Sequence, residues 1–195
     1  RMAYYLLFII ALPVLFNMEA LLELWLDEVP DTSVSFARLF LILALSESLS
    51  GPLVTGMLAT GNIRNYQILV GGLIMLNFPV SYIFLKLGAD PEVTVAVAVV
   101  ISQICLFARL YMLRKAMQFP MREYLRRVYL NIIKVTVVAS AVAWSLQTLV
   151  PAGWLGFVLG VFACVVCGAL SVLFIGCSQS ERQELLQMVL RRIRK

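Results

Sequence analysis

The stretch Leu45–Lys86, LSESLSGPLVTGMLATGNIRNYQILVGGLIMLNFPVSYIFLK, decides how the rest of the chain is arranged. It contains two apolar runs that meet at a short polar turn, residues 59–66 (ATGNIRNY). A bilayer core of ~30 Å is crossed by about 20 helical residues at ~1.5 Å each, so each run, with its flanking residues, is long enough to span a membrane. The stretch therefore predicts a helical membrane hairpin.

The composition of the whole chain indicates an all-α integral membrane protein. Of 195 residues, 62% are hydrophobic and only 14% are charged, and the mean hydropathy is +0.92. An average soluble domain is nearer half apolar and a quarter charged. The length leaves room for about six transmembrane helices. We expect these spans at residues 3–25, 34–58, 66–87, 93–113, 128–150 and 154–176.

The chain begins at Arg1 rather than at Met, and the first span starts almost at once. Nothing before that span resembles a cleavable signal peptide, and its length favours a retained helix. We expect the sequence to be the C-terminal part of a longer, transporter-like chain.

The positive charges predict an orientation in the membrane. Connections on one side carry Arg1, Arg64, Arg114, Lys115, Arg122, Arg126, Arg127, Arg191, Arg192, Arg194 and Lys195, whereas those on the other side carry only Lys86. The positive-inside rule places the first side in the cytoplasm. With an even number of spans, both ends of the sequence are then cytoplasmic.

Several kinds of chemistry are disfavoured by the residues present. Cys164 and Cys167 have C-x-x-C spacing, but they lie in an apolar run and the chain has no His to complete a mixed metal site. We interpret the cysteines as small packing residues. Without His or a phosphate-binding G-x-x-x-x-G-K-[ST] loop, we expect no enzymatic activity, no ATP hydrolysis, no metal, no cofactor and no nucleic-acid partner.

Polar residues inside the predicted spans are the candidate transport-cavity residues. A charged acid at the centre of a membrane helix costs ~2.5–3.5 kcal/mol on insertion scales, so we expect Glu47 to face protein or water. Its face carries Ala44, Ser50, Gly51, Val54 and Thr55. The alternative is that Glu47 is buried as part of a structural pair or as a protonated acid. Arg38 and Arg109 either extend to the nearby membrane boundaries or make a cavity cationic.

The third span carries a second group of candidates. Pro79 lacks the amide hydrogen that would bond to Met75, so the helix should be weakened where Asn77 and Ser81 share a face. Broken helices at membrane depth often line transport cavities, although proline kinks also occur in spans that only pack. Gln67 and Gln103 are either cavity residues or polar contacts between helices.

Residues 178–195 form a separate basic tail. Ser178 and Glu181 have capping-box spacing, and apolar residues then recur at helical spacing ahead of the final basic residues. We expect an amphipathic helix on the inner membrane surface, held by anionic lipid, with a specific protein partner as the alternative.

The chain also resembles a known family. The residues that carry the resemblance are Glu23-Leu24-Trp25-Leu26, Pro30, the turn Ala59-Thr60-Gly61-Asn62 with Tyr66, Asn77-Phe78-Pro79, and Phe84-Leu85-Lys86-Leu87-Gly88. They look like the C-terminal half of polysaccharide-biosynthesis flippases. These are O-antigen (Wzx-type) members of the multidrug/oligosaccharidyl-lipid/polysaccharide exporter superfamily, of which the multidrug (MATE) transporters are another branch. The A-T-G-N turn with the following Tyr66 is the most specific part.

The resemblance implies a fold and a function. The fold is a MATE-like protein of fourteen helices, in which residues 1–114 supply the last four helices of the second lobe. Residues 115–177 then form the basic loop and an extra helix pair, and 178–195 the tail. The function implied is movement of polyprenyl-diphosphate-linked oligosaccharide across the bacterial inner membrane for lipopolysaccharide, capsule or exopolysaccharide assembly. The partners implied are that substrate, membrane lipids and the N-terminal lobe.

Two other functions remain open. A drug/cation antiporter of the same superfamily would share the fold, and Glu47 would suit cation coupling. An integral-membrane polyprenyl transferase would need paired acids for magnesium in cytoplasmic loops. The acidic residues of the connections instead cluster on the side predicted to be periplasmic.

Overall fold

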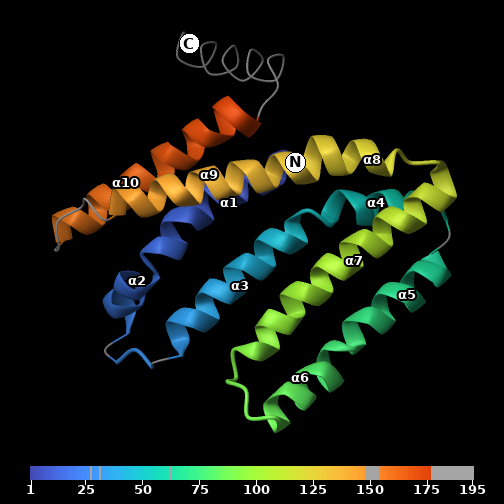
Figure 1. Cartoon of the computed structure of the whole chain (residues 1–195), viewed down its shortest axis with the longest axis horizontal. Coiled ribbons are helices and arrows are strands. Elements are labelled where there is room, and N and C mark those ends of the chain that lie inside the picture. The colour runs from blue at the N-terminus through green and yellow to red at the C-terminus, as the bar shows by residue number, and fades with distance from the viewer. Residues whose placement is uncertain (27, 31, 62, 148–153, 177–195) are drawn as a thin grey trace. The chain divides into compact units, whose positions relative to one another are not determined.

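A computed structural model describes residues 1–26, 28–30, 32–61, 63–147 and 154–176. Over these residues the protein is helical, with no β-strand (Figure 1). Five helices are long and apolar enough to cross a membrane: Ser33–Ala59, Ile63–Lys86, Val93–Met117, Met121–Gln147 and Gly156–Gly176. A bent helix pair at residues 2–25 makes a sixth if it counts as one span. The all-α prediction is therefore confirmed for the described part of the chain.

The spans are built from shorter helical elements. Their bounds are α1 Met2–Phe16, α2 Met18–Trp25, α3 Ser33–Ser48, α4 Gly51–Ala59, α5 Ile63–Met75, α6 Asn77–Lys86, α7 Val93–Met117, α8 Met121–Tyr124, a π-helical turn η1 Leu125–Tyr129, α9 Leu130–Gln147, α10 Trp154–Ser171 and a π-helical turn η2 Val172–Gly176. The predicted tail at 178–195 and the predicted turn residue Asn62 lie outside the described residues.

The helices form two compact units. The first contains residues 1–7 and 18–124. In it α7 lies between α3 and the α5–α6 pair and contacts α3, α4, α5 and α6 (Figure 1). Leu106 and Leu110 of α7 are completely buried. Close van der Waals packing against these central side chains holds the other helices of the unit around α7.

The second unit contains residues 8–17 and the described residues from 125 onward. Here α9 packs along α10, with Val135 and Cys164 fully buried. A Cβ added at Gly168 would lie 3.4 Å from the Leu12 side chain, so α10 passes close to the end of α1 at this small residue. Cys164 and Cys167 of this unit are buried and form no disulfide, and the same holds for Cys105 of the first unit. This agrees with the interpretation of these cysteines as packing residues.

The first span, predicted at residues 3–25, is bent in the structure. Helix α1 ends at Phe16, and α2 leaves at an angle of 75°. The Asn17 side-chain amide donates to the Pro13 carbonyl at 2.9 Å, the same oxygen that accepts the Asn17 backbone amide at 3.0 Å. A side chain that competes for a backbone acceptor, four residues after a proline, is a recognised cause of a helix bend.

Two further spans are interrupted near their middle. Helices α3 and α4 are separated at Leu49 and Ser50, where Pro52 cannot donate to the carbonyl of Ser48. Helices α5 and α6 are separated at Leu76, three residues before Pro79. The break in the second span was not anticipated from the sequence, although Pro52 is the signal that predicts it.

The basic connection predicted at residues 114–127 is much shorter in the structure. Helix α7 continues to Met117, and Gln118 adopts a left-handed conformation with φ of 53°. After Phe119 and Pro120 the chain enters the helical span Met121–Gln147, which includes the π-helical turn η1. Pro120 suits this position, because a proline fits just ahead of a helix start.

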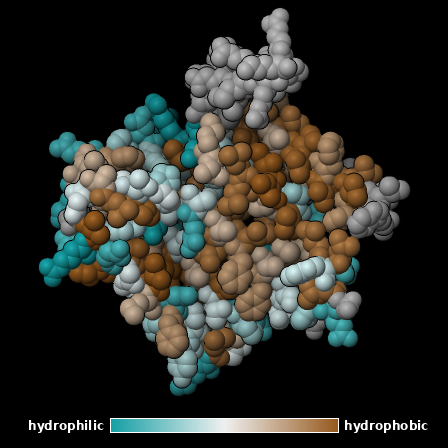
Figure 2. All heavy atoms as spheres, turned by 180° about the vertical axis from the view of Figure 1, so that it is seen from behind, coloured by the Kyte–Doolittle hydropathy of each residue, from teal (hydrophilic) through white to brown (hydrophobic). Residues whose placement is uncertain are grey.

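The outward surface of the helices is apolar, as lipid-facing surfaces are. Large exposed hydrophobic side chains occur on every long helix, for example Phe78 at 81% and Met75 at 79% exposure. Figure 2 shows broad areas of apolar side chains on one face. In the span Ile63–Lys86 only 11% of the 18-residue stretch that marks it as apolar is buried within the structure.

Candidate functional site

A cavity of about 360 Å³ opens within the first unit. Its wall is made by α3 and α4, by the end of α5 with the start of α6, and by α7. The lining residues are Leu43, Glu47, Ser50, Gly51, Val54, Ile74, Asn77, Ala98, Ile101, Ser102, Cys105 and Arg109. Three predicted cavity residues, Glu47, Asn77 and Arg109, thus meet in one place.

Both interrupted spans border this cavity at their breaks. Ser50 and Gly51 lie where α3 gives way to α4, and Asn77 is the first residue of α6. A helix interruption leaves backbone groups without their usual partners, and in membranes this is tolerated where the backbone is buried in protein or lines a water-filled cavity. The helix breaks near Pro52 and Pro79 therefore lie where Ser50 and Asn77 line the cavity.

Glu47 and Ser50 present different kinds of polar group to the cavity. Glu47 is exposed on the cavity wall, so its carboxyl group is not buried inside this chain. Ser50 is only 4% exposed, and its hydroxyl oxygen has no hydrogen-bond partner among the described residues. A buried hydroxyl without a partner costs ~1–3 kcal/mol, so a bound water or ligand would stabilise the site here.

Arg109 brings a positive charge to the same cavity. Its Nε–H donates to the hydroxyl oxygen of Tyr66 at 3.2 Å, and Tyr66 is 6% exposed at the start of α5. A guanidinium group carries five N–H donors, so the remaining donors of Arg109 can bind a ligand oxygen. Arg109 is thus held from α5 while it lines the cavity from α7.

Asn77 is also held in place. The Ser81 hydroxyl donates to Asn77 Oδ1 at 3.2 Å, and Ser81 is 7% exposed. The predicted shared face of Asn77 and Ser81 is therefore present in α6. With its Oδ1 accepting from Ser81, the Asn77 amide can donate toward the cavity.

The other predicted cavity residues do not line this cavity. Arg38 is half-buried on α3, Gln103 is half-buried on α7, and Gln67 is exposed on α5. Ser102 lines the cavity but was not singled out in the sequence. Its position three residues from Cys105 and seven from Arg109 on one helix, at helical spacing, is the signal that would have found it.

The family-like turn has a clear structural role. Ala59 ends α4, and the Thr60 hydroxyl donates to the Met57 carbonyl at 2.7 Å. Gly61 then adopts φ of 73°, which glycine reaches without the steric cost that a side chain would bring. The turn therefore ends α4 sharply and brings Tyr66 back toward Arg109.

The site combines one carboxylate, one guanidinium, two hydroxyls and one amide in otherwise apolar surroundings. Such a mixture can bind a polar or anionic solute by hydrogen bonds. Among the residues that the structure describes, there is no group of three or more His, Cys, Asp or Glu side chains that could hold a metal ion.

Comparisons of the chain with protein-family models, with curated proteins and with solved structures gave no significant match. The family resemblance accordingly rests on the residues quoted above.

Proposed function

We propose that this chain is part of a flippase that moves polyprenyl-diphosphate-linked oligosaccharide across the bacterial inner membrane during surface-polysaccharide assembly. The supporting observation is the polar cavity in which Glu47, Asn77 and Arg109 meet beside two interrupted spans. In secondary transporters, substrate sites lie near the bilayer midplane and are typically formed by discontinuous helices.

The chemistry of the cavity suits this substrate class. The guanidinium group of Arg109 is a preferred partner for phosphate oxygens. The hydroxyl of Ser50 and the amide of Asn77 suit sugar hydroxyl groups, which both donate and accept hydrogen bonds. The choice of this substrate rests on the family resemblance, and the N-terminal lobe of a complete transporter would supply the rest of its site.

A drug/cation antiporter is the second candidate. One observation favours it: Glu47, Ser50 and Ser102 line the same cavity, and oxygen atoms are the ligands that hard cations prefer. The polyprenyl transferase is less favoured, because it requires paired acids on the cytoplasmic side.

Deletion of the gene tests the proposal. We expect the deletion strain to lose surface polysaccharide and to accumulate lipid-linked repeat units on the cytoplasmic leaflet, and the complete gene to reverse both defects. Normal surface polysaccharide in the deletion strain, with new sensitivity to cationic drugs, would transfer the assignment to the antiporter.

Variants of the complete protein then test the cavity. Glu47→Gln keeps the side-chain shape and removes the charge, so we expect normal membrane abundance with reduced transport. Glu19→Gln is the matched control, because Glu19 is an exposed acid on α2 outside the cavity. Equal transport by both variants at equal abundance would remove Glu47 from the mechanism.

A further inference from the structure

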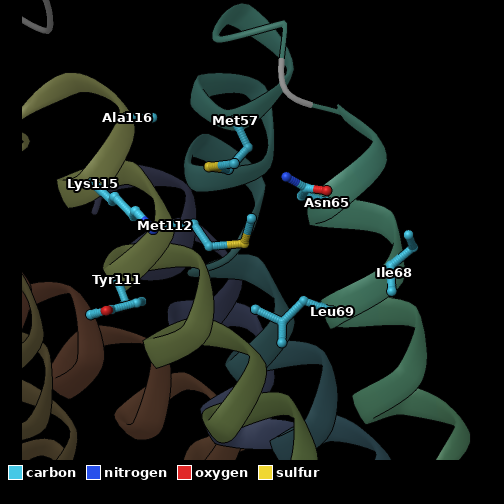
Figure 3. Close-up of a pocket in the computed structure, with 8 residues that line it drawn as sticks. All are labelled: Met57, Asn65, Ile68, Leu69, Tyr111, Met112, Lys115 and Ala116. Atoms are coloured by element: carbon cyan, nitrogen blue, oxygen red, sulfur yellow. The ribbon is translucent and has the colours of Figure 1, made fainter.

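A second crevice lies at one end of the first unit, away from the polar cavity. Its volume is about 560 Å³, and it is lined by Met57 of α4, Asn65, Ile68 and Leu69 of α5, and Tyr111, Met112, Lys115 and Ala116 of α7 (Figure 3). It shares no lining residue with the polar cavity. The volume falls within the ~300–1,000 Å³ typical of sites for small molecules.

The lining changes from polar to apolar along the helices. Asn65 lies at the start of α5 and Lys115 near the end of α7, and these two helix ends meet at the crevice. About one helical turn, or ~5 Å, away from these ends, the lining residues are Leu69 of α5 and Met112 of α7. In Figure 3, Met57, Asn65, Leu69 and Met112 surround the same space between the ribbons. The crevice is therefore amphipathic, with its polar groups at one end.

The polar end is positively charged. Arg64 and Arg114 are exposed neighbours in the sequence of Asn65 and Lys115, so three cationic side chains belong to these helix ends. The sequence has no acidic residue between Glu47 and Asp90, nor between Glu92 and Glu123. Nothing in these two stretches offsets the positive charge, which is complementary to an anionic group.

We propose that this crevice binds an acidic phospholipid from the leaflet that the positive-inside rule assigns to the cytoplasm. The phosphate of the headgroup contacts Lys115 and Asn65, and an acyl chain lies along Leu69, Ile68 and Met112. Basic pockets between membrane helices on the cytoplasmic side bind anionic headgroups in this manner. A bound lipid would fasten the beginning of α5 to the end of α7.

The crevice fits a resident phospholipid better than a transported solute. Its wall is mostly apolar: the polar groups are Asn65 and Lys115 at one end and the Tyr111 hydroxyl, fewer than the other cavity provides. Ile68 and Tyr111 are 65% and 62% exposed, so an acyl chain can enter sideways from the bilayer. The proposal is independent of the transport function, because it concerns a different set of residues.

Lipid titration of the complete protein tests the charged end. The protein is placed in phosphatidylcholine nanodiscs, dioleoyl phosphatidylglycerol is added, and bound lipids are counted by native mass spectrometry. Lys115→Gln should weaken phosphatidylglycerol binding about fivefold, since one basic residue near an anionic lipid contributes on that order. Lys86→Gln, at an exposed lysine of α6 outside the crevice, should leave binding unchanged.

A second pair of variants tests the apolar end. Leu69→Trp fills the crevice and should lower lipid retention, whereas Leu87→Trp, at a residue 77% exposed and outside the crevice, should not. Equal retention by Lys115→Gln and Lys86→Gln would overturn the proposal, as would equal binding of phosphatidylcholine. Stoichiometric displacement of the lipid by polyprenyl diphosphate would also overturn it and make the crevice a substrate site.

Discussion

The contact between Arg109 and Tyr66 gives the most direct test of the site, through the variant Tyr66→Phe. This change removes the hydroxyl oxygen that accepts the Arg109 Nε–H at 3.2 Å and leaves the buried ring in place. Hydrogen bonds to charged groups contribute ~1.5–3 kcal/mol in soluble proteins. Polar contacts between membrane helices average ~0.6 kcal/mol and reach ~1.7.

We expect Tyr66→Phe to lower the free energy of unfolding by about 1 kcal/mol, which lies within the range for contacts between membrane helices and below the range for soluble proteins. The value should not be larger, because Arg109 is only half-buried and water can replace the lost partner. Unfolding is measured by SDS titration of the complete protein in mixed micelles. The control is Tyr82→Phe, because Tyr82 is 59% exposed on α6 and should change stability by less than ~0.5 kcal/mol.

A double-mutant cycle isolates the contact. Arg109→Met keeps most of the apolar stem and removes the donor. Its effect on the free energy of unfolding is measured in the wild-type protein and in the Tyr66→Phe variant. We expect a coupling free energy of about 0.6–1.7 kcal/mol. A coupling below ~0.3 kcal/mol, the range seen for independent sites, would show that α5 does not hold Arg109 through this hydroxyl. Transport should fall further in Arg109→Met than in Tyr66→Phe, since only the former removes the charge.

Three further predictions concern single residues and topology. Ser50→Ala removes a buried hydroxyl that has no partner among the described residues, so stability should be unchanged or higher by up to ~1 kcal/mol while transport falls; a clear loss of stability in the same titration would contradict this account. Gly61→Ala should lower the free energy of unfolding by about 1 kcal/mol, because φ of Gly61 is 73°. The control Gly72→Ala, with no atom within 4 Å of an added Cβ, should leave stability unchanged or raise it. A larger loss of stability for Gly72→Ala than for Gly61→Ala would refute the role of the turn. Single cysteines at Asn62 and Asp90 of a cysteine-free complete protein should react with an impermeant thiol reagent from the cytoplasmic and periplasmic sides respectively; labelling of position 62 from outside intact cells would overturn the orientation.

Local sequence features predicted most of the helices and the interruption beside Pro79, but not the bend near Asn17 or the break at Leu49 and Ser50. The apolar runs located the spans, because a membrane helix needs a fixed length of apolar residues. The first span was located at residues 3–25 without a bend being predicted, whereas the helix pair there is bent by 75°. A proline in a membrane helix can be accommodated in several ways, so its presence does not fix an angle. At this bend the Asn17 side-chain amide donates to the Pro13 carbonyl, a contact that the sequence pattern alone does not specify.

The sequence by itself determined which residues were candidates for the site. Glu47, Asn77 and Arg109 stand out because polar groups are rare and costly in apolar spans. Gly61 was named only as part of the turn that carries the family resemblance, and its left-handed conformation was found in the structure. These inferences depend on local chemistry, which one stretch of chain contains completely.

Only the tertiary structure decided which candidates meet. Glu47, Asn77 and Arg109 come from three different spans and line one cavity, whereas Arg38 and Gln103, equally polar and on two of those spans, do not. The rotation of each helix about its axis is set by packing against α7, and a break within a helix resets that rotation for the residues beyond it. The rotation of a helix, and its change at a break, cannot be predicted from the periodicity of a single span. Both depend on contacts between side chains far apart in the sequence.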